Sequence, residues 1–229
     1  MASILCSEAV LVNQGIDAAR AVTMRCRSWK CELCQPGRKR KLVNLAKSGQ
    51  PETFITLTVN PAQGESPEDR ARTLVKAWRL IVKRAKRRYG LAKLAYLCVF
   101  EATKAGEPHL HILSTVKWMD QKWLSRQMAE IANAPIVDIR KVRSVTHAAR
   151  YIAKYIGKAP HRFGTCKRYW HTRGWNLDPW KPETWGTGWC AKWEICETTI
   201  AKLQFAWWLR GWQTARRHGL LYGGLDVPP

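Results

Sequence analysis

Two histidines stand two positions apart in the stretch EPHLHIL, where apolar and polar residues alternate as in a half-buried β-strand. Side chains two apart on a strand point to the same face, so we expect His109 and His111 to lie side by side. A hairpin with the preceding strand would place Glu101 opposite His109. Two imidazoles and a carboxylate leave coordination positions open for a substrate, which predicts a divalent-metal site. The same ligands also suit a non-haem Fe(II) oxygenase, and histidines on a sheet can be ordinary solvated side chains.

Two tyrosines stand four positions apart in the stretch YIAKYIGK. On a helix, Tyr151 and Tyr155 share one face beside the apolar stripe. Basic side chains on the neighbouring surface, Arg150, Lys154 and Lys158, can hold a phosphate and favour the phenolate. Lys154 directly precedes Tyr155 and Lys158 follows it within one turn, which favours Tyr155 as the residue that carries a covalent link. The alternative is an amphipathic helix with a solvated basic face.

Three of the eight cysteines, Cys26, Cys31 and Cys34, follow a C-x4-C-x2-C spacing. The C-x2-C half is typical of a zinc knuckle, and Cys6 upstream supplies a fourth thiolate. The N-terminal residues lack the features of a secretory signal, so we expect reduced thiols. A structural Zn²⁺ is therefore predicted, with free buried thiols as the alternative. Three later cysteines compete with Cys6 for the fourth position: Cys166, Cys190 and Cys196.

The charge balance indicates a polyanionic partner. The chain of 229 residues holds 39 Lys and Arg against 17 Asp and Glu, a formal net charge of +22, which is far more than solubility requires. No apolar run approaches the roughly 20 residues of a transmembrane helix. We therefore expect a nucleic acid rather than a membrane as partner, and a cytoplasmic location.

Residues 162–180 interleave basic and aromatic side chains, a pattern that suits single-stranded DNA passing stacked rings. Arg168 and Arg173 in this segment are candidate DNA contacts, together with Arg150 and Lys158. The same aromatic side chains could equally cover the core.

The elements that must position these residues follow from periodicity and capping signals. Ser66 and Pro67 begin a helix that ends near Gly90. Strands are predicted over 54–59, 93–101, 109–116 and 135–142, and helices over 66–90, 120–133, 144–158 and 198–219. The central order β-α-β-β-α-β-α predicts the α+β class, with helices packed on an antiparallel sheet.

Three stretches in the order FITLTVNP, HLHIL and YIAKYIGK resemble the motifs of the HUH endonucleases that initiate rolling-circle replication. The paired tyrosines most resemble the initiators of small single-stranded DNA phages and related plasmids. The resemblance implies a ferredoxin-like or RRM-like topology for a nuclease core over residues 52–158. A basic segment with the zinc cluster over residues 1–51 and a Trp-rich extension with a C-terminal helix over residues 159–229 would flank this core.

The resemblance also implies a reaction. Mg²⁺ or Mn²⁺ at His109, His111 and Glu101 would polarise a phosphate of an origin in single-stranded DNA. Tyrosine attack would leave a 5′-phosphotyrosyl link and a free 3′-hydroxyl, with Lys154 steadying the phosphate. The chain lacks G-x-x-x-x-G-K-[ST], so a host helicase would unwind the duplex and a host polymerase would extend the 3′-end, in a bacterial host cell. The alternative is a non-catalytic zinc-containing DNA-binding protein.

Overall fold

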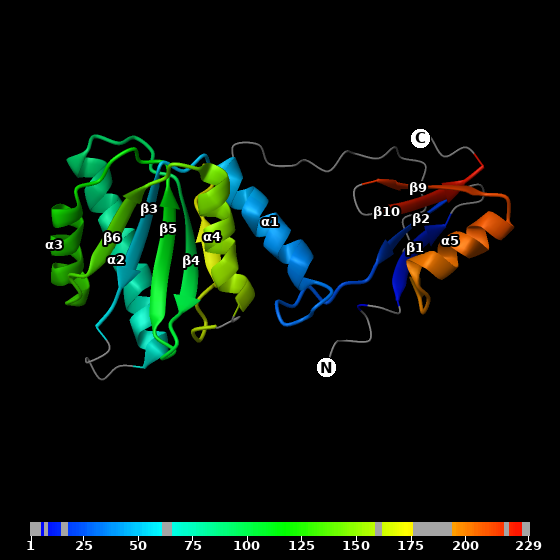
Figure 1. The fold of residues 1–229 in the computed structure, drawn as a ribbon, viewed down its shortest axis with the longest axis horizontal. Coiled ribbons are helices and arrows are strands. Elements are labelled where there is room, and N and C mark those ends of the chain that lie inside the picture. Colours follow the sequence, from blue (N-terminus) through cyan, green and yellow to red (C-terminus); the bar gives the residue numbers. More distant parts are fainter. Residues whose placement is uncertain are drawn as a thin grey trace. The chain divides into compact units, whose positions relative to one another are not determined.

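The middle of the chain forms an antiparallel sheet of five strands in the order β6-β3-β5-β4-β7, of which Figure 1 labels the first four. In the computed structural model, residues 6, 9–14, 18–60, 66–158, 162–175, 194–217 and 220–225 are described. The strands of this sheet are β3 (Thr53–Thr58), β4 (Tyr96–Ala102), β5 (Pro108–Ser114), β6 (Val137–Lys141) and β7 (Tyr169–His171).

Three helices alternate with these strands in the predicted β-α-β-β-α-β-α order. They are α2 (Pro67–Arg88), α3 (Gln121–Ala132) and α4 (Val145–Lys158). The start of α2 is the predicted one, because the Ser66 hydroxyl accepts the backbone N–H of Asp69. The helix α3 begins at the Asp120 cap and ends at Asn133, a left-handed residue with φ 47°.

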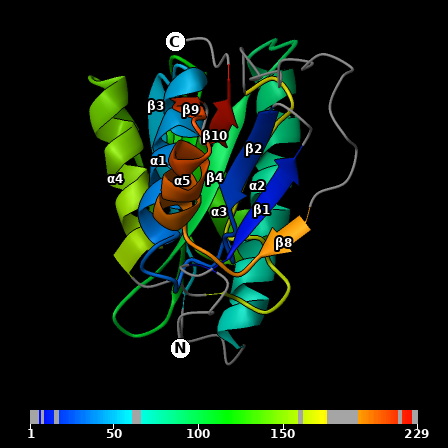
Figure 2. The ribbon, with the colours of Figure 1, turned by 90° about the vertical axis from the view of Figure 1, so that its right-hand side faces the viewer.

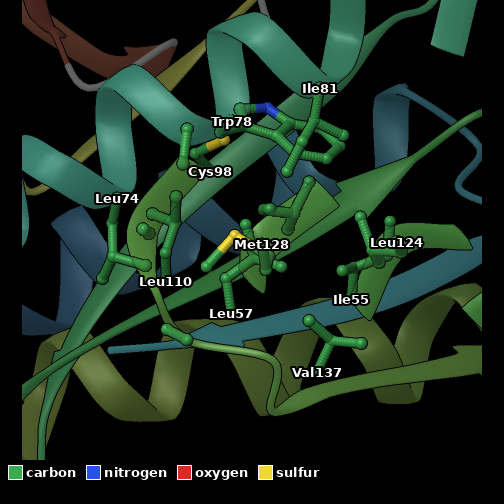
Figure 3. Close-up of a cluster of buried hydrophobic side chains, with 14 of the residues drawn as sticks. Ile55, Leu57, Leu74, Trp78, Ile81, Cys98, Leu110, Leu124, Met128 and Val137 are labelled. Atoms are coloured by element: carbon green, nitrogen blue, oxygen red, sulfur yellow. The ribbon is translucent and has the colours of Figure 1, made fainter. Parts of the chain in front are cut away.

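The main core lies between one face of this sheet and the helices α2 and α3 (Figure 3). Strand β5 contributes Leu110 and Ile112 to it, and β3 contributes Ile55 and Leu57. Trp78 of α2 is fully buried among them. Helix α4 lies on the opposite face of the sheet from α2 (Figure 2). The intervening residues of each strand therefore face α4, which is the side where the histidines stand.

Helix α1 (Gln35–Ser48) was not predicted, because its sequence QPGRKRKLVNLAKS holds few apolar residues and a long basic run. Leu42 and Ala46 are its buried residues. Trp175, which is fully buried, donates its indole N–H to the Leu45 carbonyl at 2.7 Å and lies directly against Gly49. A few well-placed contacts thus hold a largely polar helix.

A second sheet, in the order β8-β1-β2-β10-β9, joins early and late segments of the chain. Its elements are β1 (Val10–Gln14), β2 (Ala18–Thr23), β8 (Glu194–Cys196), β9 (Gln213–Arg217), β10 (Leu220–Gly224) and the helix α5 (Ile200–Leu209). Trp207 of α5 is buried with Val10 and Leu221 of this sheet. Residues 1–37 with 181–229 thus form one compact unit, and residues 38–180 form the other.

The C-terminal helix is shorter than the sequence predicted. Helix α5 ends at Leu209, and the residues predicted to continue it form strand β9. Gly211 adopts φ +74°, a conformation outside the helical region that lets the chain reverse. The two antiparallel sheets and five described helices confirm the α+β class. Within the described ranges, no helix has the length and apolar character needed to cross a membrane.

Candidate functional site

The strand register brings the predicted ligands to one face of the sheet. His109 pairs with Glu101 on β4 and with Thr58 on β3, while His111 pairs with Thr56. Directly paired residues of antiparallel strands share a face. The hairpin expectation for Glu101 is therefore met by the register itself.

His111 is the most constrained side chain of this group, since only 5% of its surface is exposed. Its Nε2 lies 2.6 Å from a carboxylate oxygen of Glu101, and its Nδ1 lies 3.1 Å from the hydroxyl of Thr56. The 2.6 Å separation is that of a hydrogen bond between the imidazole and the carboxylate. The same nitrogen and oxygen atoms are a donor set that a divalent metal accepts, so the residue types fit a metal site.

His109 lies beside His111, with the two ring centroids 6.4 Å apart. Burial, and next the neighbouring His111, lower the pKa of His109 below its ordinary value. A neutral imidazole is the form that binds metals. Together with Glu101 the pair offers two nitrogen ligands and a hard oxygen ligand.

The two tyrosines of α4 face this cluster. Tyr155 stacks on His111 with ring centroids 4.6 Å apart and an interplanar angle of 15°. Tyr151 packs edge-on against Tyr155 at 4.8 Å and against Phe54 at 5.6 Å. The helix is held in place by Ala149, Ile152 and Ala153, which are fully buried.

The environments of the two phenols differ. Tyr151 is 41% exposed, whereas Tyr155 is half-buried. Burial, followed by a hydrogen bond with Tyr151, raises the pKa of the Tyr155 hydroxyl. Lys154 and Arg150 are exposed on the same helix. Lys158 is its last residue, and the Lys158 side chain lies outside the described part of the structure.

The cysteine cluster is assembled as the sequence predicted. The Sγ atoms of Cys6, Cys26, Cys31 and Cys34 all lie within 4.8 Å of one another. Cys6 and Cys34 are 3.6 Å apart, and the backbone N–H of Cys26 donates to the Cys6 sulfur at 3.0 Å. A backbone hydrogen bond from Cys34 is the main cause that lowers the pKa of the Cys31 thiol to about 7. Four converging thiols match the closed, tetrahedral set of a structural metal such as zinc.

The alternatives for the fourth thiol are placed elsewhere. Cys166 packs against the main core, and Cys196 packs against the core of the second sheet. Cys190 lies outside the described residues. Cys6 is thus the thiol that joins the C-x4-C-x2-C group.

Three aromatic side chains of the 162–180 segment, Phe163, Trp170 and Trp175, pack in or against buried parts of the protein. Trp170 packs against the main core beside Phe100, and Trp175 is buried against α1. Arg168 is half-buried, and burial lowers its pKa, while Arg173 is exposed. Trp180 lies outside the described residues. A stacking role for DNA bases is therefore not supported by Trp170 or Trp175.

Sequence reasoning missed two side chains that contact the site. Thr56 orients His111, and the Phe54 ring lies 5.5 Å from the His111 ring and 5.6 Å from that of Tyr151. Both alternate with buried Ile55 on β3. The alternation alone places them on the histidine face, but only the register shows which histidine each one meets.

Fold and site together define an α+β protein in which paired tyrosines of one helix face a histidine and carboxylate cluster on an antiparallel sheet. Residues 52–160 match the family described as replication-associated protein ORF2. This match supports a Rep-like protein with a role in replication initiation and in binding DNA. No curated protein and no solved structure matches the chain significantly.

Proposed function

We propose that this protein is a metal-dependent HUH-type endonuclease that nicks single-stranded DNA at a replication origin and rejoins the strands. The observation that carries the proposal is the continuous contact from His111 through Tyr155 to Tyr151. It puts two nucleophile candidates beside the ligand set at once.

His109, His111 and Glu101 are the residues that would hold Mg²⁺ or Mn²⁺, which supplies Lewis-acid polarisation of the scissile phosphate when bound. Thr56 keeps the His111 ring in its orientation through the Nδ1 hydrogen bond. The exposed side chains of Lys154 and Arg150 are free to approach a phosphate from the solvent side.

The covalent step is an exchange of phosphate ester bonds. A tyrosine hydroxyl releases its proton to solvent as its oxygen forms a bond to the phosphorus, the bond from phosphorus to the 3′-oxygen breaks, and the 3′-oxygen takes up a proton from solvent. The phosphate stays linked to the tyrosine through its 5′-side. A 3′-hydroxyl later attacks this phosphotyrosine and releases the tyrosine, which closes the strand. Two tyrosines allow a second cut while the first link persists.

The greater exposure of Tyr151 supports it as the first nucleophile. Tyr155 is half-buried and its ring is stacked on His111, which leaves its hydroxyl less accessible to a DNA strand. This assignment reverses the preference for Tyr155 that neighbouring lysines suggested.

We assign a structural Zn²⁺ to the four-cysteine cluster and single-stranded origin DNA to the nuclease face. Unwinding and synthesis are assigned to a helicase and a polymerase of a bacterial host. A second candidate function is a non-catalytic zinc-containing DNA-binding protein, which the four converging thiols also favour.

The test is covalent capture. Purified protein is incubated with random single-stranded DNA and Mn²⁺, and adducts are separated by denaturing electrophoresis. The wild type should give a protein-DNA adduct, and Tyr151→Phe or Tyr155→Phe should each leave a residual amount. The double change should give none, since Phe keeps the ring packing and removes only the hydroxyl.

Two controls separate chemistry from folding. Tyr96→Phe is the matched control, because Tyr96 packs against Trp78 on the opposite face of the sheet. The combined change of His109 and His111 to Ala should abolish the adduct while DNA binding falls only modestly, since phosphate contacts supply most of the affinity. An undiminished adduct in the double tyrosine variant would refute the tyrosine mechanism, whereas a wild type that forms no adduct would favour the non-catalytic alternative.

A further inference from the structure

A pocket of about 320 Å³ opens between strand β6 and the start of helix α4, within the same compact unit as the site. Its size is at the small end of ligand sites, which span about 300–1,000 Å³. It has room for one nucleotide rather than for a folded partner. Six of its lining residues carry the argument below: Phe54, Asp138, Arg140, Lys141, Arg143 and Tyr151.

The pocket continues the site rather than standing apart from it. Tyr151 lines it, and Phe54 both lines the pocket and contacts the His111 ring. Strand β6 pairs with β3 so that Asp138 lies opposite Thr56, which in turn lies opposite His111. Two strand spacings of about 4.8 Å therefore separate the Asp138 and His111 backbones, roughly 10 Å in all.

The lining chemistry matches a nucleotide. Arg140, Lys141 and Arg143 supply positive charge for a phosphate. The Phe54 ring and the edge of Tyr151 supply apolar surface for a base or sugar. Asp138 is the one carboxylate among the lining residues, so it is the acceptor that can distinguish bases.

Asp138 is held in position by a neighbour. Arg140 donates to its carboxylate at 2.8 Å along the same strand, and 46% of the Asp138 side chain remains exposed. The pair thus presents an acceptor beside a donor. A base with an exocyclic amino group can donate to the carboxylate through that group and accept from the guanidinium, whereas thymine has no amino group and offers only its ring N3–H as a donor.

We propose that this pocket binds the nucleotide next to the attacked phosphate and selects a base with an exocyclic amino group through Asp138. The inference rests on the proposed function, because it takes the substrate to be single-stranded DNA lying across Tyr151. It adds a source of sequence preference to a site whose other contacts would be made chiefly to phosphate.

The experiment measures binding, so it does not depend on cleavage. The probes are oligonucleotides recovered from the random single-stranded DNA, either as covalent adducts or as bound DNA. Each position is replaced in turn by thymine and by an abasic residue, and fluorescence anisotropy gives the affinity of the full-length protein for each probe. One position should show a loss of about tenfold with either replacement. Asp138→Ala should reduce that ratio to about one, and Asp138→Asn should reduce it without removing the side chain.

The matched control is Arg87→Ala, an exposed basic position on α2 across the sheet, which should keep the full ratio. A free nucleoside monophosphate distinguishes the sources of the ligand. Deoxycytidine monophosphate is added as a competitor of the bound oligonucleotide. Displacement of the oligonucleotide by this free nucleotide would overturn the proposal in favour of a free-nucleotide site.

Base preference that is unchanged in both Asp138 variants would also overturn it. The proposed function fails separately, when wild-type protein binds DNA with this preference but forms no covalent adduct. The two failures therefore have different readouts.

Discussion

The ion pair between Arg70 and Glu107 offers the sharpest test of how the β4–β5 hairpin, which carries the candidate site residues, is held in place. Arg70 of α2 makes two hydrogen bonds of 2.7 Å to the two carboxylate oxygens of Glu107, in the turn between β4 and β5. The exposed fractions of the two side chains are 7% and 19%. The backbone N–H of Glu107 also donates to the Thr103 hydroxyl, so both the side chain and the backbone of Glu107 help to fix the turn.

Glu107→Ala removes the carboxylate and leaves the nearly buried Arg70 cation without its two bonds to that group. Breaking a buried pair from one side costs about 3–5 kcal/mol, and we expect about 3 kcal/mol because Glu107 is partly solvated. For a domain of this size the melting temperature should fall by roughly 6–12 °C. The double change Arg70→Met with Glu107→Leu should recover much of the loss, because no buried charge then remains.

Urea and thermal unfolding followed by circular dichroism check this expectation, with the transition of the 38–180 unit analysed by itself. Glu130→Ala is the matched control, since Glu130 makes the same two-pronged contact with Arg84 at a largely exposed position and should change stability little. Equal effects of Glu107→Ala and Glu130→Ala would refute the view that burial makes the first pair important.

Two further perturbations follow from close contacts. Extensively dialysed protein should keep about one Zn²⁺ per chain by elemental analysis. The joint change of Cys31 and Cys34 to Ser should lower both the metal content and the unfolding temperature. A wild type that is fully folded without metal would contradict the zinc site. Gly49→Ala would place its Cβ against the Trp175 ring atoms and should lower the free energy of unfolding in urea by about 1–3 kcal/mol. The control is Gly174→Ala, whose Cβ meets nothing within 4 Å and should be tolerated. Equal stability of the two variants would refute the close contact between Gly49 and Trp175.

The sequence predicted the core sheet well because its signals are local. Strand β3 alternates cleanly, and α2 begins at a Ser-Pro cap that needs no tertiary context. Strands β1 and β2 were not predicted. They are short, and although they pair with each other, their outer edges pair with β8 and β10, nearly two hundred positions away along the sequence, in the registers Val10↔Cys196 and Leu221↔Ala21. Such partners leave no nearby pattern to read.

The candidate site also has a part that local sequence patterns predict and a part that depends on the tertiary structure. The shared face of His109 and His111 follows from strand periodicity alone. The contact between Thr56 and His111 spans 55 positions and depends on which strand lies beside β5. The unequal exposure of Tyr151 and Tyr155 depends on how closely α4 packs on the sheet, which helix periodicity does not determine.

The second sheet ties together segments that a ribosome produces at opposite times. Strands β1 and β2 emerge early, but their partners β8 and β10 are made only after the whole 38–180 unit. A two-stranded hairpin on its own is at best marginally stable in water. Until β8 and β10 have been synthesised, both outer edges of the β1–β2 hairpin therefore remain unpaired. Unpaired strand edges are surfaces that chaperones bind. Slowing translation between residues 38 and 193 should prolong that interval and increase aggregation, while the 38–180 unit folds as soon as it is complete.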